Sequence, residues 1–238
     1  MAEEPKPGGL NSDTQNIDYE ANLLLGRYYI DPNTPLPSFD SPSARAFSVE
    51  DRRDIGRQLF ALICTPELPP RLETMKALKG EQISGLLPLV EWGVVFWPPS
   101  SARIMVVVFE HPLGGRVIDA KPEHTMHMHE YDIPRNIFEP LTTAISELSE
   151  RNITHRAIRP ENLYFMDPEC TQIVLGECVT GPAAFDQPIM FEPLHRISAN
   201  PGGRGEGETS DDLYALGICI FIIITGKNPL ENTSDINI

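Results

Sequence analysis

The sequence predicts an α+β fold in two parts, with strands and one helix in the first half and longer helices in the second. Short apolar runs rich in Val, Ile and Phe recur through residues 23–116 and are broken by prolines. Apolar residues then recur at helical spacing through residues 136–152, and a second apolar stretch begins near residue 211. With 238 residues and 41% hydrophobic content, the chain is long enough to bury a sizeable core.

The first half contains the strand signals. Residues 1–20 combine Pro, Gly and acidic side chains with almost no large apolar ones, so we expect a flexible acidic tail. The runs LLLGRYYI, QLFALIC, LLPLVEWGVVFW and RIMVVVFE have the length and composition of strands. Between the second and third runs, PPRLETMKALKG opens with prolines and ends in glycine, as a short helix does. Residues 21–115 are therefore expected to form a β-rich lobe.

The second half begins with an amphipathic helix, NIFEPLTTAISELSERN, with a bend expected at Pro140. LYFM and TQIVLGE flank the turn DPE and predict a hairpin. Residues 181–209 are rich in Pro and Gly and lack periodicity, which is typical of a functional or mobile loop. The apolar run at residues 213–225 is shorter than the about 20 residues that cross a bilayer, so we interpret it as a buried helix.

Composition restricts the partners and the compartment. The formal net charge of −15 disfavours nucleic acid and anionic membranes as partners. The four cysteines are far apart, without CxxC spacing, and the N-terminus lacks a basic-then-apolar signal, so we expect a reduced, cytoplasmic protein.

Two motifs carry a family resemblance. ITHRAIRPENL, residues 153–163, is similar to the protein-kinase catalytic loop H-R-D-L-x-x-x-N, and SDDLYALG is similar to the start of the helix beneath that loop. LFALIC, EHPLGG and VLGECV resemble, in the same order, the V-A-I-K strand, the hinge and the strand that ends in D-F-G. From residue 23 to residue 230 the chain thus resembles the protein kinase-like superfamily, and in particular a bacterial Ser/Thr-kinase-like pseudokinase domain.

The resemblance implies a two-lobed protein-kinase-like fold. Residues 21–115 correspond to the small lobe and residues 116–238 to part of the large lobe. In the family further helices follow this point, so the resemblance predicts either an excised fragment or a lobe whose apolar surface is covered by a partner or by the rest of a longer chain.

The departures from the family pattern concern catalysis. Ala157 stands at the position of the catalytic aspartate, and Cys64 stands at the position of the strand lysine that pairs with the nucleotide phosphates. Lys76 and Lys79 are the nearest lysines and are an alternative source of charge. Where the family has its glycine-rich phosphate loop, this chain has PNTPLPSFDSPSARAF, whose prolines have no N–H to offer a phosphate.

Three residues correspond to remaining nucleotide or metal contacts. Arg159 falls at the position of a phosphate-contacting lysine, and Asn162 falls at the position of a metal-binding asparagine. Aligning VLG with the strand places Glu177 at the D-F-G aspartate, so Asn162 and Glu177 are the candidate metal ligands. In the other register Gly176 takes that position and no ligand remains.

Three further residues match framework positions of the family: His155, Arg156 and Asp212. The resemblance implies that the first two pack the loop and that the Asp212 carboxylate accepts backbone N–H groups from it. The sequence leaves the roles of two further groups of residues undecided. The histidines of HTMHMH, residues 124–129, are either a surface loop or a metal chelate. Five arginines are candidates for a basic pocket beside the long loop: Arg151, Arg156, Arg159, Arg196 and Arg204.

The sequence therefore predicts a pseudokinase, a kinase-like domain that binds, scaffolds or regulates and has no catalytic residues. We expect no cofactor, and a protein partner or the remainder of a longer chain as the binding partner. The alternative is an enzyme, a nucleotide-dependent transferase that is either a weak Ser/Thr kinase or a nucleotidyl transferase, with ATP and Mg²⁺ held through Asn162 and Glu177.

Overall fold

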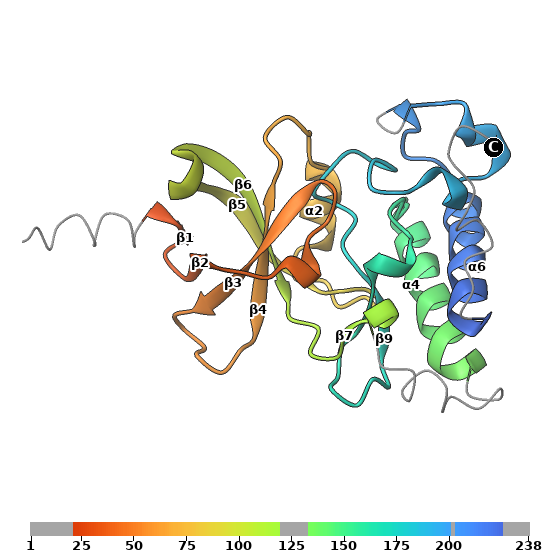
Figure 1. Ribbon diagram of the computed structural model, residues 1–238, viewed down its shortest axis with the longest axis horizontal. Helices are drawn as coiled ribbons and strands as arrows, with labels where there is room; N and C mark the ends of the chain where they lie inside the picture. The colour runs from red at the N-terminus through yellow and green to blue at the C-terminus, as the bar shows by residue number, and fades with distance from the viewer. Residues whose placement is uncertain (1–20, 120–132, 201–202, 226–238) are drawn as a thin grey trace, which may run out of the picture.

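The computed structural model describes residues 21–119, 133–200 and 203–225, and Figure 1 shows a strand-rich part on one side and the helices α4 and α6 on the other. The predicted acidic tail and the histidine cluster at residues 124–129 lie outside the described residues.

The first lobe is built on a six-stranded antiparallel sheet of order β1-β2-β3-β4-β6-β5. Its strands are β1 (Leu23–Leu24), β2 (Tyr28–Pro35), β3 (Ala44–Asp51), β4 (Leu59–Cys64), β5 (Leu89–Trp97) and β6 (Ala102–Glu110). The first and last strands in this order, β1 and β5, touch each other, and Gly93 makes room for the Leu24 side chain. The sheet thereby curls around one apolar core, while the helix α2 (Leu72–Leu78) packs on its other face with Met75 fully buried.

The sequence patterns miss β3. The segment ARAFSVED, whose first four residues end the stretch PNTPLPSFDSPSARAF, pairs with β2 and β4. Its inward residues include Ala44 and Ala46, which are small and produce only a weak alternation of hydrophobicity. The stretch before β3 includes the short 3₁₀ helix η1 (Pro37–Phe39). Pro32 and Pro35 lie in β2, Pro37 begins η1, and Pro42 lies between η1 and β3.

The second lobe joins a small sheet to two long helices. Its strands β7, β8 and β9 lie in that order, and β8 and β9 form the predicted hairpin. The π-helical turn η4 leads directly into α4, and Pro140, the second residue of α4, has no N–H to donate; the bend expected there stays a prediction. The elements are β7 (Gly115–Arg116), η3 (Val117–Asp119), η4 (Pro134–Phe138), α4 (Glu139–Glu150), η5 (Pro160–Asn162), β8 (Leu163–Phe165), β9 (Ile173–Leu175), η6 (Ile189–Phe191), α5 (Leu194–Ile197) and α6 (Thr209–Thr225), with η2 (Pro98–Ser100) in the first lobe.

The helix α6 is only half buried, so the expectation of a buried helix is wrong for one of its faces. One face packs into the core through residues such as Ala215 and Cys219. The opposite face leaves large apolar side chains open to solvent, with Leu213 47%, Phe221 49% and Ile224 48% exposed. Among the described residues, no helix combines the length and the apolar character that a membrane crossing needs.

Backbone bonds connect the two lobes. The Leu87 N–H donates to the Leu175 carbonyl at 2.8 Å, and the Leu175 N–H donates to the Gly85 carbonyl at 2.8 Å, which joins the segment after α2 to β9. The main apolar core also runs without interruption from β4 and α2 to α4, β9 and α6. The cleft between the lobes is therefore bounded by elements whose relative placement is fixed.

Candidate functional site

The loop that resembles the catalytic loop is held from below by Asp212, at the start of α6. The His155 and Arg156 backbone N–H groups donate to the two Asp212 carboxylate oxygens at 2.6 and 2.8 Å. Arg156 has a positive φ of 57°, a conformation that needs support from its surroundings. Burial raises the pKa of Asp212 to about 6 despite these two bonds, which act to lower it. Asp212 is thus a support for the loop.

The His155 ring is buried and uses both of its nitrogens. Nε2 lies 3.1 Å from the Gly176 carbonyl, and Nδ1 accepts the Ala157 N–H at 3.3 Å. This arrangement requires the neutral ring with its proton on Nε2, because Nδ1 acts as an acceptor. Burial lowers the pKa of His155 to about 3. The ring therefore connects the loop to the end of β9.

Ala157 occupies the position of the catalytic aspartate and is 5% exposed. Its methyl side chain can neither orient a substrate hydroxyl nor accept its proton, a role typically worth about 10²- to 10⁴-fold in rate. The nearby Asn162 donates from Nδ2 to the Ala157 and Glu177 carbonyls, both at 2.8 Å. A Cβ on Gly176 would overlap the Asn162 amide oxygen, so a glycine is required there.

Glu177 directs its carboxylate into its own turn. Oε2 accepts the backbone N–H groups of Val179 and Thr180 at 2.8 and 3.0 Å, and Oε1 accepts the Thr180 hydroxyl at 2.7 Å. Glu177 would have to give up some of these bonds to bind a cation. In the described ranges, no cluster of three or more His, Cys, Asp and Glu residues has a metal-binding arrangement. The pairing of Asn162 with Glu177 as metal ligands stays a prediction.

Cys64 ends β4 and shares its core-facing side with Phe60 and Leu62. Burial, helped by the negative charges of Glu177 and Asp186, raises the pKa of the Cys64 thiol to about 12, so it is neutral. Lys76 of α2 does not supply the positive charge of the family's lysine, because its ammonium pairs with Glu73 at 2.6 Å on the surface.

Lys79, the other candidate for this positive charge, is also paired at another place, because its ammonium lies 2.6 Å from Glu91 of β5. Both lysines are more than two fifths exposed, Lys76 at 57% and Lys79 at 43% of their side chains. The alternative in which one of them reaches the cleft is therefore wrong for this structure.

Phe39 packs its aromatic side chain between the two lobes. Its ring centroid lies 5.1 Å from Phe60 of β4, 4.9 Å from His111 after β6 and 5.8 Å from Tyr164 of β8. Phe60 belongs to the first lobe and Tyr164 to the second, so the Phe39 ring lies between the two lobes, and the residue is 7% exposed. Such aromatic pairs contribute about 0.5–1.5 kcal/mol each beyond their buried area.

The segment that carries Phe39, residues 36–43, is bonded to the second lobe at two of its residues, Asp40 and Ser43. The Ser43 hydroxyl lies 2.7 Å from the Thr180 hydroxyl and donates to Asp186 Oδ2 at 2.6 Å. Arg116 of β7 donates to the Asp40 carbonyl at 2.5 Å. Burial, and then the neighbouring charge of Glu177, raises the pKa of Asp186 to about 6. We call residues 36–43 the plug segment.

Arg71, immediately before α2, bonds to three carbonyls of the second lobe. Its guanidinium donates to the His155 and Cys178 carbonyls at 3.0 Å each and to the Thr154 carbonyl at 2.8 Å. It also pairs with Glu206, which is exposed. Because Arg71 is 7% exposed, these contacts are largely shielded from solvent. They hold α2 to the catalytic-loop region in one arrangement.

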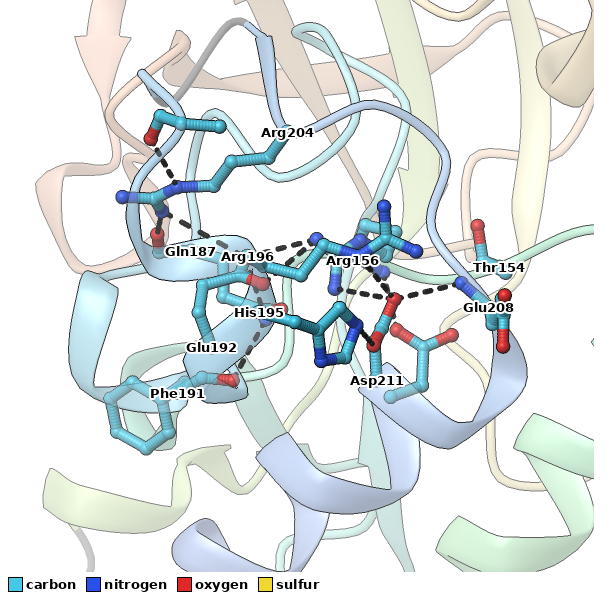
Figure 2. A network of polar contacts seen from close by, with 12 residues as sticks. Thr154, Arg156, Gln187, Phe191, Glu192, His195, Arg196, Arg204, Glu208 and Asp211 are labelled. Carbon is cyan, nitrogen blue, oxygen red and sulfur yellow. Dashed lines mark hydrogen bonds and ion pairs between the residues drawn. The ribbon is translucent and has the colours of Figure 1, made fainter.

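Three of the five predicted arginines converge on two buried carboxylates (Figure 2). Arg156 donates to both Glu192 carboxylate oxygens at 2.9 and 3.1 Å, and Arg204 lies 3.8 Å from the same group. Arg196 donates to Asp211 at 3.2 Å.

The other two predicted arginines lie elsewhere. Arg151 lies 3.7 Å from both Glu81 and Glu147, and Arg159 lines a separate pocket. The arrangement in Figure 2 is thus a set of ion pairs between residues 156, 192, 196, 204 and 211, and it is not an open basic pocket.

Sequence patterns did not single out Phe39, Arg71 or Glu192. Phe39 lies in a proline-rich stretch, where one aromatic residue carries no periodic signal. Arg71 and Glu192 have partners about 83 and 36 residues away, at separations that no local pattern reveals.

Comparisons with known proteins agree with this fold. No family model matches the chain. Curated relatives include the serine/threonine-protein kinase PrkC of Bacillus subtilis, 26% identical over 43% of this chain and 16% of its own length. Another is the calcium/calmodulin-dependent protein kinase type 1 of Caenorhabditis briggsae, 24% identical over 82% of this chain and 55% of its own length.

A solved structure shows the same architecture. The crystal structure of Rad53 1-466 in complex with AMP-PNP aligns with a TM-score of 0.66, 16% identity and coverage of 95% of this chain and 56% of its own. The predicted two-lobed α+β kinase-like fold is confirmed. The chain spans between about a sixth and about half of the length of these relatives.

The fold and the cleft define the class, a two-lobed domain of kinase type. In sequence and in fold the chain is similar to members of the protein kinase-like superfamily, with Ser/Thr protein kinases among its curated relatives.

Proposed function

We propose that this domain is a pseudokinase that acts by binding and does not transfer phosphate. The observation that carries the proposal is the position of Phe39, whose ring contacts both lobes inside the cleft where a kinase holds its nucleotide. Cys64 and Ala157 support it independently, because each replaces a charged group of the reaction by an uncharged one.

A calorimetric titration with ATP and Mg²⁺ tests this proposal. We expect no binding by the unmodified chain, and none by the double variant Cys64→Lys/Ala157→Asp, because the Phe39 ring still fills the cleft in both. Adding Phe39→Ala to the double variant removes the ring and separates occlusion from loss of charge. Micromolar ATP affinity of the unmodified chain contradicts the proposal.

The alternative, a transferase that uses Asn162 and Glu177, is distinguished by labelled ATP. Transfer of the γ-label indicates a weak kinase, and transfer of the α-label indicates nucleotidyl transfer. Asn162→Ala abolishes either activity if the assignment holds. The Glu177 bonds to its own turn argue against this alternative, since a metal ligand needs a free carboxylate oxygen.

The exposed face of α6 supports the proposal that the domain binds a protein surface. This surface belongs either to a partner or to the rest of a longer chain. Helices that are apolar all round are normally covered, yet Leu213, Phe221 and Ile224 are each about half exposed. Sedimentation of the isolated chain at increasing concentration should show self-association. Phe221→Ser should reduce it, whereas equal behaviour of the two chains contradicts this role of the face.

A further inference from the structure

Four buried polar side chains join the plug segment to the segment after β9. In order of contact they are Glu177, Thr180, Ser43 and Asp186, and we call them the hydroxyl network. The Thr180 hydroxyl lies 2.7 Å from Glu177 Oε1 and 2.7 Å from the Ser43 hydroxyl. The Ser43 hydroxyl in turn lies 2.6 Å from Asp186 Oδ2. Each of the four residues is at most 7% exposed, so the network is shielded from solvent.

The hydroxyl network has three contacts but only two hydroxyl protons. A hydrogen bond needs one proton between its two oxygens, and an ionised carboxylate can only accept. If both carboxyl groups are ionised, the two hydroxyl protons point to them, and none remains for the 2.7 Å contact between Ser43 and Thr180. Ser41, 3.3 Å from Ser43, brings one more proton but also one more contact. The count is complete only if one carboxyl group carries a proton.

Asp186 is the carboxyl group that suits this proton. Glu177 Oε2 accepts two backbone N–H groups of its own turn, and such bonds stabilise an ionised carboxylate. Asp186 Oδ1 is buried and has no hydrogen-bond partner in the described part of the chain, so ionisation of Asp186 is poorly compensated. Burial, and then the charge of Glu177, raises the pKa of Asp186 to about 6, although Ser43 and Arg159 act to lower it.

Other charged groups surround Asp186 without replacing this proton. They line the two pockets to which Asp186 belongs: Asp40, Arg45, Arg116, Arg159, Glu161 and Arg204. Arg45 is paired with Asp40 at 2.7 Å, and Arg204 lies 3.8 Å from Glu192. On the side of β4, Asp186 faces the neutral Cys64 thiol. No arginine of the described residues is paired with Asp186, so the surroundings leave its charge without a direct partner.

We propose that Asp186 holds a proton that fastens the plug segment, and that the segment opens more readily when this proton is lost. In the protonated arrangement Asp186 donates to Ser43, and Ser43 donates to Thr180. Thr180 donates to Glu177, so that all three contacts are hydrogen bonds. In the ionised arrangement one of them becomes a contact between lone pairs. The inference goes beyond the proposed function and holds whether or not the domain transfers phosphate.

The closed plug segment binds this proton more tightly than the open one. When the segment opens, water reaches Asp186, and its pKa returns towards the ordinary value of about 3.9. Closure is therefore strongest at low pH and weakens as the pH rises through about 6. From pH 5 to pH 7.5 the ratio of open to closed segment should rise about tenfold. The Phe39 contacts and the Arg116 bond do not involve this proton, so the segment stays mostly closed at both pH values.

Hydrogen exchange followed by mass spectrometry at pH 5 and pH 7.5 measures this ratio. After division by the intrinsic exchange rate of each amide, exchange in residues 36–43 should be about tenfold faster at pH 7.5. Infrared titration of the same chain detects the proton itself, as a carboxylic-acid C=O band that disappears as the pH rises through about 6. Asp212 titrates in the same range, so the band of Asp186 is the part that Asp186→Asn removes.

Three variants separate the proton from the charge of the surroundings. Asp186→Asn has a permanent N–H donor in place of the carboxyl proton, so exchange in residues 36–43 should stay slow at both pH values. Glu161→Gln removes an exposed negative charge from the same pocket and should keep the tenfold difference. Thr180→Val removes the contact that lacks a proton. The Ser43 proton then serves Asp186 alone, so the infrared band should titrate at lower pH and the exchange difference should shrink.

The outcomes decide the proposal. Equal exchange of residues 36–43 at the two pH values in the unmodified chain overturns it, and so does a pH difference that persists unchanged in Asp186→Asn or disappears in Glu161→Gln. If Asp186→Asn does not fold by its thermal transition, Thr180→Val carries the test, and an unshifted infrared band in that variant overturns the proposal. None of these results bears on the pseudokinase proposal, which ATP titration tests.

Discussion

Replacing His155 should change how the stability of the domain depends on pH. The folded state keeps this ring neutral, since one nitrogen donates to Gly176 and the other accepts from Ala157. Burial lowers its pKa to about 3, whereas the unfolded chain binds a proton at the ordinary value of about 6.5. The free energy of unfolding therefore decreases as the pH falls through this interval.

The magnitude follows from linkage. The folded state keeps the ring neutral, so its pKa is lower than in the unfolded chain. Between these two pKa values the free energy of unfolding falls by about 1.4 kcal/mol for each unit by which the pH is lowered. Acidification from pH 7 to pH 4.5 crosses about two such units, so His155 alone should remove about 2–3 kcal/mol of unfolding free energy. The contribution is fully present above pH 6.5 and is lost progressively towards pH 3.

The assay is urea unfolding of the unmodified chain and of His155→Gln at pH 7 and pH 4.5. The variant should be less stable at pH 7, because it loses the fit of the ring, but its stability should fall by about 2–3 kcal/mol less on acidification. Other groups that titrate in this range, Asp186 and Asp212 among them, are common to both chains and largely cancel. Parallel pH profiles of the two chains would refute the reasoning.

Three further predictions concern the same framework. Asp212→Ala should lower the unfolding free energy by about 2–6 kcal/mol, because two buried N–H groups lose their acceptor. Asp212→Asn should lower it less, because the amide keeps one acceptor oxygen. Urea unfolding measures both changes. Gly207→Ala should lower the melting temperature, because Gly207 has a φ of 67° and a Cβ there would lie 2.6 Å from Asp211. Gly203 has open space around it, so Gly203→Ala should leave the melting temperature nearly unchanged. Arg71→Ala should speed hydrogen exchange in the loop around residue 155, and unchanged exchange there would contradict its role in joining the lobes.

The fold was largely predictable because its signals are local or motif-based. Apolar runs of strand length, one helix-period segment and the two motifs HRAIRPEN and SDDLYALG are each contained in short stretches of chain. Their order along the chain is enough to suggest two lobes. The exception, β3, carries small inward residues, and its identity depends on pairing with β2 and β4 rather than on its own composition.

The sequence predicted which kinase residues are replaced at the site, but it did not predict which side chains pack between the lobes. Ala157 and Cys64 are visible as substitutions within recognisable motifs. What occupies the cleft instead was not predictable, because Phe39 reaches Tyr164 across about 125 residues of chain and no periodicity links the two. The same holds for the bond from Ser43 to Asp186.

The sequence by itself determined the class of fold and the loss of the groups that transfer phosphate, because both depend on which residue types occur in which order. Only the tertiary structure decided that Phe39 packs between the two lobes, that Glu177 binds its own turn and that Arg159 lines a pocket. These features arise from contacts between distant parts of the chain. Packing sets such contacts, and a linear pattern does not record them.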